Sequence, residues 1–433
     1  MIKNIIPLSV VLSLRFFALF IVLPVISLFA LERESSTQYL VGLAIGGYAL
    51  TQILFQIPFG ILSDKIGRKP IIIFGLVLFA IGSLVCAESD NIYTLIIGRF
   101  IQGAGAVAAV ITAMISDLVK EEIRTKAMAL MGGSIAASFA LAMVLGPILG
   151  AYLGFEKLFL FSALLSIISI ILVIKSPNPP IISHPTTAKF SEIVKNKNIM
   201  KMNLTNFLQK AFMTLAFLII PIVLVKDFGW EKSELIKVYL PSLVFGILSM
   251  PIAAILAEKK GKFKEVLMVG VGFFMLSYLL IALEINELFF VFGIVIFFIG
   301  FNMHEPIMQS LASKYVKSNQ KGAALGYFNT FGYLGTFIGG VFGGLLLQYF
   351  SLTVLCFAIV IISIFWLFVL KSLTNPHLTQ NLYFNLNEIK NRDILSHEAI
   401  EEYYENLHEK ILVVKFDKTK LDIESIKNSL KGN

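Results

Sequence analysis

The stretch GILSDKIGRKPIII, residues 60–73, places a charged cluster between two long apolar runs. Its charged residues are Asp64, Lys65, Arg68 and Lys69. Gly67 permits a tight turn, and Pro70 suits the first position of a following helix. Gly60 allows a neighbouring backbone to approach closely. The stretch therefore predicts a short turn between two tightly packed helices.

The composition of the whole chain is too apolar for a soluble domain. Of the 433 residues, 57% are hydrophobic and 15% are charged, and the mean hydropathy is +0.83. Soluble domains are about 45–50% apolar and about a quarter charged. The excess of apolar residues therefore predicts burial in a lipid bilayer.

Apolar runs long enough to span a bilayer, which takes roughly 20 residues, recur in two sets of six. The first set lies near 5–30, 39–62, 71–87, 92–115, 127–153 and 157–174. The second set lies near 202–225, 234–257, 265–283, 288–312, 322–348 and 352–370. The first run is too long for the apolar core of a signal peptide, roughly 7–15 residues. We interpret it as the first of twelve membrane helices.

Lysine and arginine are unequally distributed between the two sets of loops. One set is rich in both, near 65–69, 120–126, 175–201, 259–264 and 314–321, whereas the alternate loops carry Arg33, Lys157, Lys226 and Lys232. Basic loops are retained in the cytoplasm, so we expect both termini to be cytoplasmic. Attraction to anionic headgroups accounts for the net charge of +8, and we expect no nucleic-acid partner.

The charged loop has a counterpart in the second half of the chain. ILSDKIGRK at 61–69 resembles ILAEKKGKF at 255–263, which matches Asp64 with Glu258 and Gly67 with Gly261. With the same offset in sequence between the two halves, Gly132, Gly146 and Gly150 match Gly326, Gly340 and Gly344. An even number of spans in each half predicts parallel repeats with a substrate site between two bundles.

This repeat divides the chain into four parts. We expect six-helix bundles at 1–174 and 202–370, joined by a cytoplasmic linker at 175–201. The end of that linker has an amphipathic pattern that predicts an interfacial helix, and a solvated linker is the alternative.

The tail, residues 371–433, has the composition of a small cytoplasmic α+β domain. We expect a strand near 382–386, a helix with Ile400, Tyr403, Tyr404 and Leu407 on one face, a strand in KILVVKF and a last helix after Asp422. A unit this short is small for a self-sufficient core. We therefore expect it to dock onto the rest of the chain, a partner or a second copy.

Three motifs resemble those of the major facilitator superfamily. Its signature between helices 2 and 3 is matched by Gly60, Leu62, Asp64, Gly67, Arg68 and Lys69. RFIQGAGAVAAV at 99–110 and LGPILGAYLG at 145–154 are similar to motifs of its drug/proton antiporter branch, the second through Gly146, Pro147 and Gly150. Ala151 stands where that motif has its last glycine.

The resemblance implies an all-α membrane protein of two six-helix bundles and a function in secondary transport. It implies export of a small lipophilic solute across the inner membrane in exchange for protons. It also implies that Asp64 meets the start of helix 11 and that Arg68 joins Asp117 and Arg124, as a conformational latch. Its candidate residues are Gly60, Asp64, Gly67, Arg68, Lys69, Asp117 and Arg124. The alternative is that these charges only set the topology.

Ionisable residues inside membrane spans are candidates for function, because burying a charge in lipid is unfavourable. Those placed well inside are Arg15, Arg99, Lys210 and Glu305. In the resembling branch the position of Arg99 is tied to proton movement, and a structural arginine bonded to carbonyls is the alternative. Glu305 is a proton-coupling candidate, with pairing to a lysine or a helix end as its alternative. Adjacent His304 is expected to be a packing residue.

The sequence lacks the motifs expected for nucleotide binding, zinc binding or nucleophilic catalysis. No G-x-x-x-x-G-K-[ST] phosphate loop, zinc-like spacing of His and Cys or nucleophile–base motif is present. We therefore expect no enzymatic activity, cofactor or metal site. Two alternatives to proton-coupled export remain open: an uncoupled facilitator, and a membrane sensor that signals through its tail.

Overall fold

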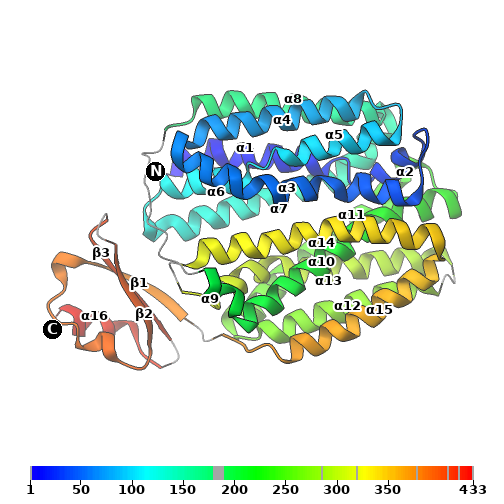
Figure 1. The fold of residues 1–433 in the computed structure, drawn as a ribbon. Coiled ribbons are helices and arrows are strands. Elements are labelled where there is room, and N and C mark those ends of the chain that lie inside the picture. Colours follow the sequence, from blue (N-terminus) through cyan, green and yellow to red (C-terminus); the bar gives the residue numbers. More distant parts are fainter. Residues whose placement is uncertain are drawn as a thin grey trace.

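The computed structural model describes residues 2–178, 190–283, 286–317, 320–376, 379–406, 409–417 and 420–431. Figure 1 shows long, roughly parallel helices with a small sheet-containing domain projecting from one end. We call this end, where both ends of the chain lie, the tail end. The opposite end contains α2 (Ile26–Leu31), and we call it the α2 end.

The helices fall into two sets. The first contains α1 (Ile2–Phe20), α2, α3 (Gln38–Ile66), α4 (Arg68–Ala87), α5 (Ile92–Ala104), α6 (Ala108–Asp117), α7 (Glu121–Leu153) and α8 (Phe155–Lys175). The second contains α10 (Lys197–Ile222), α11 (Ile236–Ala254), α12 (Phe263–Ala282), α13 (Glu287–Lys314), α14 (Lys321–Tyr349) and α15 (Leu352–Lys371). The π-helical turns η1 (Val223–Asp227) and η3 (Ile255–Lys259) extend α10 and α11, and the 3-10 helix η2 (Lys232–Leu235) precedes α11.

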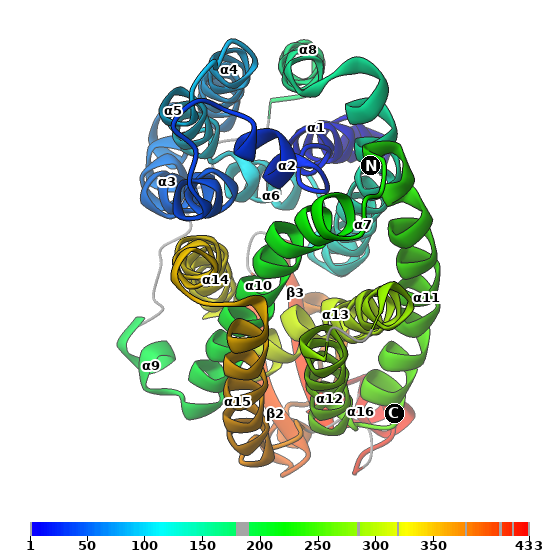
Figure 2. The ribbon, with the colours of Figure 1, turned by 90° about the vertical axis from the view of Figure 1, so that its right-hand side faces the viewer.

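The described residues contain 11 helices long and apolar enough to cross a membrane, together with the shorter apolar helix Ile5–Phe20. Figure 2, an end-on view, shows the two sets as separate bundles in which α3 lies beside α14 and α7 beside α11. The predicted fold class, a helical membrane protein with a small α+β domain, is confirmed.

Two spans predicted as continuous helices are interrupted. The first breaks between α1 and α2, where Pro24 lacks the N–H that a helix requires. The span predicted at 92–115 breaks at Gly105–Val107, between α5 and α6. Both breaks free backbone carbonyls for other partners, and the Gly105 carbonyl accepts a hydrogen bond from Arg15.

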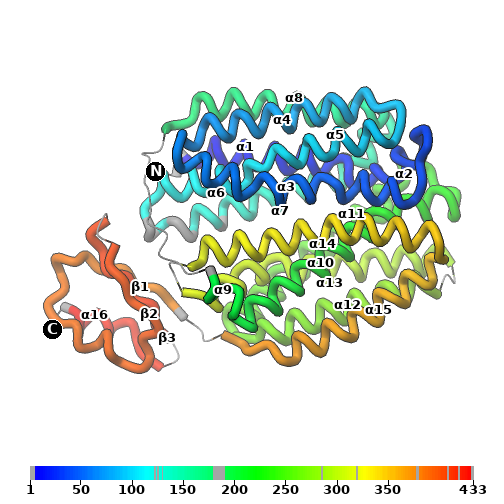
Figure 3. Tube along the Cα trace, in the orientation of Figure 1, coloured from blue at the N-terminus to red at the C-terminus, as the bar shows by residue number. Residues whose placement is uncertain are grey.

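The end of the linker forms the short helix α9 (Phe190–Lys195). Figure 3 shows α9 beside the start of α10. Ile193 is buried, and Glu192 accepts a hydrogen bond from Gln320 (2.8 Å) at the start of α14. The part of the linker at 179–189 lies outside the described residues.

The tail domain is a three-stranded antiparallel sheet covered on one face by a helix. Its strands are β1 (Thr379–Asn385), β2 (Ile400–Asn406) and β3 (Ile411–Asp417), in the order β1-β3-β2, followed by α16 (Ile423–Lys431). Phe384, Leu412, Val414, Phe416 and Ile426 form much of its core.

The helix predicted around Ile400 and Tyr404 is wrong, because that segment is strand β2. Its side chains alternate between half-buried and exposed, and Tyr404 lies opposite Val413 of β3. Ile400 and Tyr404 share a face in a helix and also in a strand. Antiparallel pairing with the following strand, β3, decides between the two. Leu407, expected on the same face, lies outside the described residues.

The connector between α15 and the tail domain, residues 372–376, is bonded to three helices of the second bundle. Asn198 of α10 donates to the Thr374 hydroxyl (2.8 Å), and Asn375 accepts from a backbone N–H in the first turn of α12 (2.8 Å). The Tyr315 hydroxyl, just after α13, donates to the Thr374 carbonyl. Burial raises the pKa of that hydroxyl, which keeps it protonated and able to donate.

Candidate functional site

The charged loop folds around Arg68. Gly67 ends α3 with a φ of +99°, a conformation that favours glycine. Arg68 then pairs with Asp64 one turn earlier and donates to Asp117 at the end of α6 (3.0 Å) and to the Ser63 hydroxyl (2.8 Å). Arg68 and Asp117 are largely buried. The network therefore joins α3, α4 and α6 within the first bundle.

Other parts of the expected latch are placed differently. Lys69 donates to the carbonyl of Ile174 at the end of α8 (3.1 Å), and the side chain of Arg124 lies outside the described residues. The Asp64 side chain is 60% exposed, and the described residues show no hydrogen bond or ion pair between it and α14. The described side chains of this cluster hold the first bundle together, and none of them is bonded to the second bundle.

The two bundles meet at the α2 end, where α3 crosses α14 through glycines. A Cβ atom at Gly42 would lie 2.0 Å from the Gly340 carbonyl oxygen, and one at Gly344 would lie 2.5 Å from the Gln38 carbonyl oxygen. Small residues permit such close helix contact. Lys232 also pairs with Glu32 (2.6 Å) across the bundles. The α2 end is therefore closed.

At the tail end the same two helices do not approach each other in this way. A Cβ atom at Gly60 of α3, or at Gly322 or Gly326 of α14, would meet no atom within 4 Å. The close approach expected at Gly60 is thus not made in this structure. Helices α3 and α14 thus pack closely at the α2 end and are separated at the tail end.

The antiporter-type motif packs against the break in the first span. A Cβ atom at Gly146 would lie 2.3 Å from the Ile21 carbonyl oxygen, and one at Gly150 would lie 3.3 Å from a methyl group of Val25. Pro147 lies inside α7 between them. These residues bring α7 against the segment that joins α1 to α2.

Arg99 is fully buried in the first bundle and has several partners. It donates to the carbonyls of Ala44 (3.0 Å) and Ile45 (3.4 Å) and to the Gln102 side chain (2.7 Å). The guanidinium also lies 4.7 Å from the Tyr48 ring centre. These contacts favour the alternative that we gave for Arg99, a structural arginine bonded to carbonyls.

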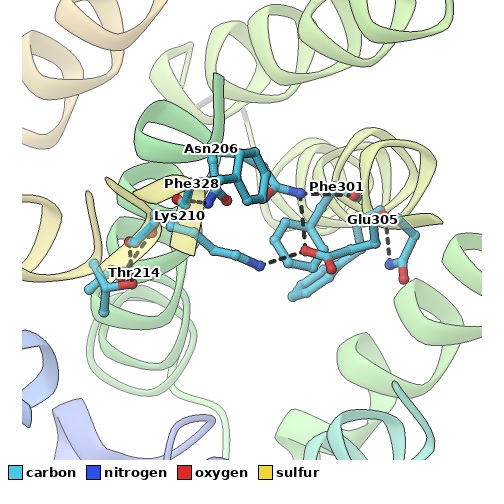
Figure 4. Close-up of polar contacts among 11 residues, drawn as sticks. Asn206, Lys210, Thr214, Phe301, Glu305 and Phe328 are labelled. Carbon is cyan, nitrogen blue, oxygen red and sulfur yellow. Dashed lines mark hydrogen bonds and ion pairs between the residues drawn. The ribbon is translucent and has the colours of Figure 1, made fainter. Parts of the chain in front are cut away.

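Lys210 and Glu305 form an ion pair inside the second bundle. The Lys210 ammonium lies 2.6 Å from Glu305 Oε1, which also accepts from Gln209 (3.2 Å). Figure 4 shows Lys210 of α10 pointing toward Glu305 of α13, beside Phe301. Glu305 is nine residues before the end of α13 at Lys314, or roughly 14 Å from it. The two side chains are 26% and 32% exposed, so water can reach them.

Aromatic rings connect this pair to the first bundle. Lys210 lies 4.9 Å from the Phe301 ring, which is 6.1 Å from the ring of Phe139 on α7. Phe139 in turn lies 5.2 Å from Phe20 of α1. The interface between the bundles thus presents aromatic surface next to an accessible ion pair. His304, beside Glu305, is buried and bonded to the Leu267 carbonyl (2.9 Å), which is consistent with a packing role.

The sequence alone does not indicate the polar partners of these residues. Gln209 is adjacent to Lys210, and Gln52 contacts Arg15, but neither amide stands out within its apolar run. Glu32 and Lys232 lie in separate loops with no shared pattern. Gln52 and Gln209 are polar residues inside predicted spans, and this is the one feature of the sequence that could have drawn attention to them.

Comparison with known proteins identifies the family. The model of the Major Facilitator Superfamily matches residues 8–339 and 202–383. The inner membrane transport protein YajR of Escherichia coli K12 is 34% identical over 423 residues, covering 95% of this chain and 93% of that protein. The tetracycline resistance protein, class H, of Pasteurella multocida is 28% identical, over 74% of this chain and 81% of its own.

Solved structures support the same fold. A bacterial homolog of the human lysosomal transporter Spinster superposes with a TM-score of 0.72 at 14% identity, over 86% of this chain and 97% of its own. A D-xylose–proton symporter superposes with a TM-score of 0.71 at 15% identity, over 87% of this chain and 99% of its own. The expected resemblance is therefore confirmed at the level of the family, and this multi-pass membrane protein belongs to the transporters of the major facilitator superfamily.

Proposed function

We propose that this chain exports a small lipophilic solute in exchange for protons, and that Glu305 carries the exchanged proton. The observation that carries the proposal is the accessible ion pair between Lys210 and Glu305 in the middle of the second bundle. Ionisable residues at this depth mark ion pathways in membrane proteins. The aromatic surface beside the pair suits an apolar solute.

Proton binding and ion pairing compete at Glu305. Protonation removes the negative charge that attracts the Lys210 ammonium, and release of the proton restores the attraction. The state of Glu305 is therefore coupled to the packing of α10 against α13. A solute that enters between the bundles meets the same two helices, which links solute movement to proton movement.

Alternating access would use both ends of the α3–α14 pair. In the state described here the α2 end is closed and the tail end is apart. In the opposite state we expect the tail end to close, with Asp64 at the N-terminus of α14, where the helix dipole favours an acid. With the tail end in the cytoplasm, protons that enter the cell down their gradient would drive this cycle in the direction that moves solute outward.

The test is flux of a lipophilic solute in proteoliposomes, with and without a pH gradient. Glu305→Gln should lose gradient-driven transport but keep solute exchange in the absence of a gradient, because the amide cannot titrate. Glu405→Gln is a matched control, since Glu405 is 33% exposed and pairs with Arg392 (2.7 Å) in the tail domain. Gradient-driven flux that survives in Glu305→Gln would contradict the proton site.

Measurements on the wild-type chain and on a chain without the tail domain separate the remaining alternatives. Flux that is unchanged when the pH gradient is collapsed would indicate an uncoupled facilitator. A chain without the tail domain that still transports but no longer evokes a cellular response would indicate a sensor. Partner or dimer contact through the tail stays a prediction, which the oligomeric state of the full chain and of the tail-deleted chain would test.

A further inference from the structure

Arg15 is a buried cation whose charge is not compensated. Its side chain is 1% exposed, and no acidic side chain pairs with it among the residues that the structure describes. Its Nη2 donates to the Gln52 side chain (2.7 Å) and to the Gly105 carbonyl (3.3 Å). Its Nε and Nη1 atoms are buried without a hydrogen-bond partner among the described residues. Residues of α1, of α3 and of the break between α5 and α6 thus surround a guanidinium with unused donors.

Arg15 lies at the interface between the two bundles. The rings of Phe16 and Phe79 are 5.1 and 5.7 Å from the guanidinium. Tyr333 of α14 is close enough to Arg15 and Gln52 to interact electrostatically with both. Tyr333 also packs against the apolar cluster that contains Ala18 and Leu19 of α1. Tyr333 of the second bundle therefore lies against Arg15 and Gln52, and we call these three residues the cluster.

A buried charge of this kind requires a partner. An isolated ion in a low-dielectric environment is strongly unfavourable, and a lost hydrogen bond adds to the unfavourable free energy. Water would satisfy the unused donors but would leave the positive charge uncompensated. Arg99, which is also fully buried in this bundle, differs because carbonyls and Gln102 occupy its donors. An anion would occupy the unused donors of Arg15 and compensate its charge at the same time.

A row of aromatic rings runs from Arg15 to the proposed proton site. Phe16 stacks on Phe20 (5.4 Å), and Phe20 is followed by Phe139 (5.2 Å) and Phe301 (6.1 Å). Phe301 then contacts Lys210, the partner of Glu305. An apolar body placed along these rings has a cation at one end and the Lys210–Glu305 pair at the other.

The cluster lies on the tail side of the closed helix crossing. Gln52 is ten residues from Gly42 along α3, or roughly 15 Å, in the direction of the tail end. Tyr333 is seven residues from Gly340 along α14 in the same direction. A solute that enters from the tail end reaches the cluster without opening the Gly42–Gly340 crossing.

We propose that Arg15, Gln52 and Tyr333 recognise a carboxylate group on the transported solute, whose apolar body lies along the rings between Arg15 and Glu305. The substrate class is thus an aromatic or aliphatic carboxylate. This inference rests on the proposed transport function and specifies its substrate. Guanidinium and carboxylate groups form strong charge-assisted hydrogen bonds.

The test compares 2-naphthoate with 2-naphthamide, its neutral counterpart, as ligands of the purified full chain in nanodiscs. Gln52→Glu places a permanent carboxylate beside Arg15, which occupies the site and compensates the charge, so this variant should fold. We expect it to weaken naphthoate binding roughly 10- to 100-fold and to affect naphthamide binding much less, so that the preference for the acid is lost. Gln348→Glu, at the α2 end, is the matched control and should bind both compounds as the wild type does.

A second variant separates charge from position. Arg15→Lys keeps the cation and should retain part of the preference for naphthoate, whereas Arg15→Gln should bind acid and amide alike. Equal binding of the two compounds to the wild type, no binding of naphthoate up to its solubility limit, or unchanged naphthoate binding in Gln52→Glu would overturn the inference. These measurements use no pH gradient, so failure of proton coupling at Glu305 would not affect them.

Discussion

The two ends of α3 are held by different forces. At the α2 end, backbone meets backbone across the bundles, with Gly42 against Gly340. At the tail end, Arg68 ties α3 to its own bundle through Asp64 and Asp117, and Gly60 has no close neighbour. Close packing fixes one end in this state, whereas the charges at the other end preserve the shape of a bundle that is free to move. In the proposed cycle the packed end would have to open and the tail end would have to close.

Removing the arginine at the tail end should have the largest effect on stability. Arg68→Ala leaves Asp117 largely buried without its cation, and removing one partner of a buried pair costs roughly 3–5 kcal/mol. We expect a clear fall in the unfolding temperature of the detergent-solubilised chain. Lys65→Ala, an exposed change in the same turn, is the control and should shift it little. An Arg68→Ala chain as stable as the wild type would show that the network is not structural.

Adding one methyl group at the α2 end should change the balance between states. Gly42→Ala forces the two backbones apart, and overpacking of this kind costs about 1–3 kcal/mol, which corresponds to about a 5- to 150-fold shift in population. Distances between spin labels at Glu34→Cys and Tyr349→Cys should lengthen. Gly326→Ala, which enters open space on α14, should leave them unchanged. Equal distances in both variants would refute the role of the crossing.

Neutralising Asp64 should affect turnover more than stability. Its partner in this structure is Arg68, and its side chain is mostly exposed, so Asp64→Asn should change the free energy of unfolding by less than about 1 kcal/mol. Loss of its interaction with a helix N-terminus in the opposite state should slow transport by up to about 30-fold. Wild-type transport rates in proteoliposomes would remove Asp64 from the proposed latch.

The smallest expected effect is that of Gly60→Ala. Alanine is favoured over glycine within a helix by roughly 0.5–1 kcal/mol, and the new methyl group meets no atom in this structure. We therefore expect a slightly more stable protein that nevertheless transports more slowly, because the tail ends of α3 and α14 must approach in the opposite state. If stability and transport both rise, the proposed closure at Gly60 is incorrect.

Much of the fold could be predicted because its signals are local. The apolar runs locate the spans, and Gly67 marks the turn before Arg68. The breaks after α1 and α5 were not predicted, although Pro24 and Gly105 lie at them, since neither residue always interrupts a membrane helix. The tail strand β2 was predicted as a helix because its apolar pattern is compatible with the helical period and with the strand period. Only the pairing of β2 with β3 shows that the segment is a strand.

The candidate site was less predictable because its contacts join residues far apart in the sequence. Lys210 and Glu305 were each recognised as unusual, but their pairing depends on how α10 packs against α13. Gln52 became significant only when the structure placed it on Arg15. The placement of Arg68 against Asp117 was expected from family resemblance and not from the spacing of the two residues.

The hydrogen bonds of the connector give the tail domain a practical use. Residues 372–376 are bonded to α10, to α12 and to Tyr315 just after α13, and to no helix of the first bundle among the described residues. The tail domain is therefore attached to the second bundle through an anchored connector. If the bundles alternate as proposed, energy transfer between a fluorophore on the exposed Tyr403 of this domain and another on the exposed Lys65 near the end of α3 should change with every cycle. Single molecules could then be timed, turnover by turnover, before any substrate has been identified.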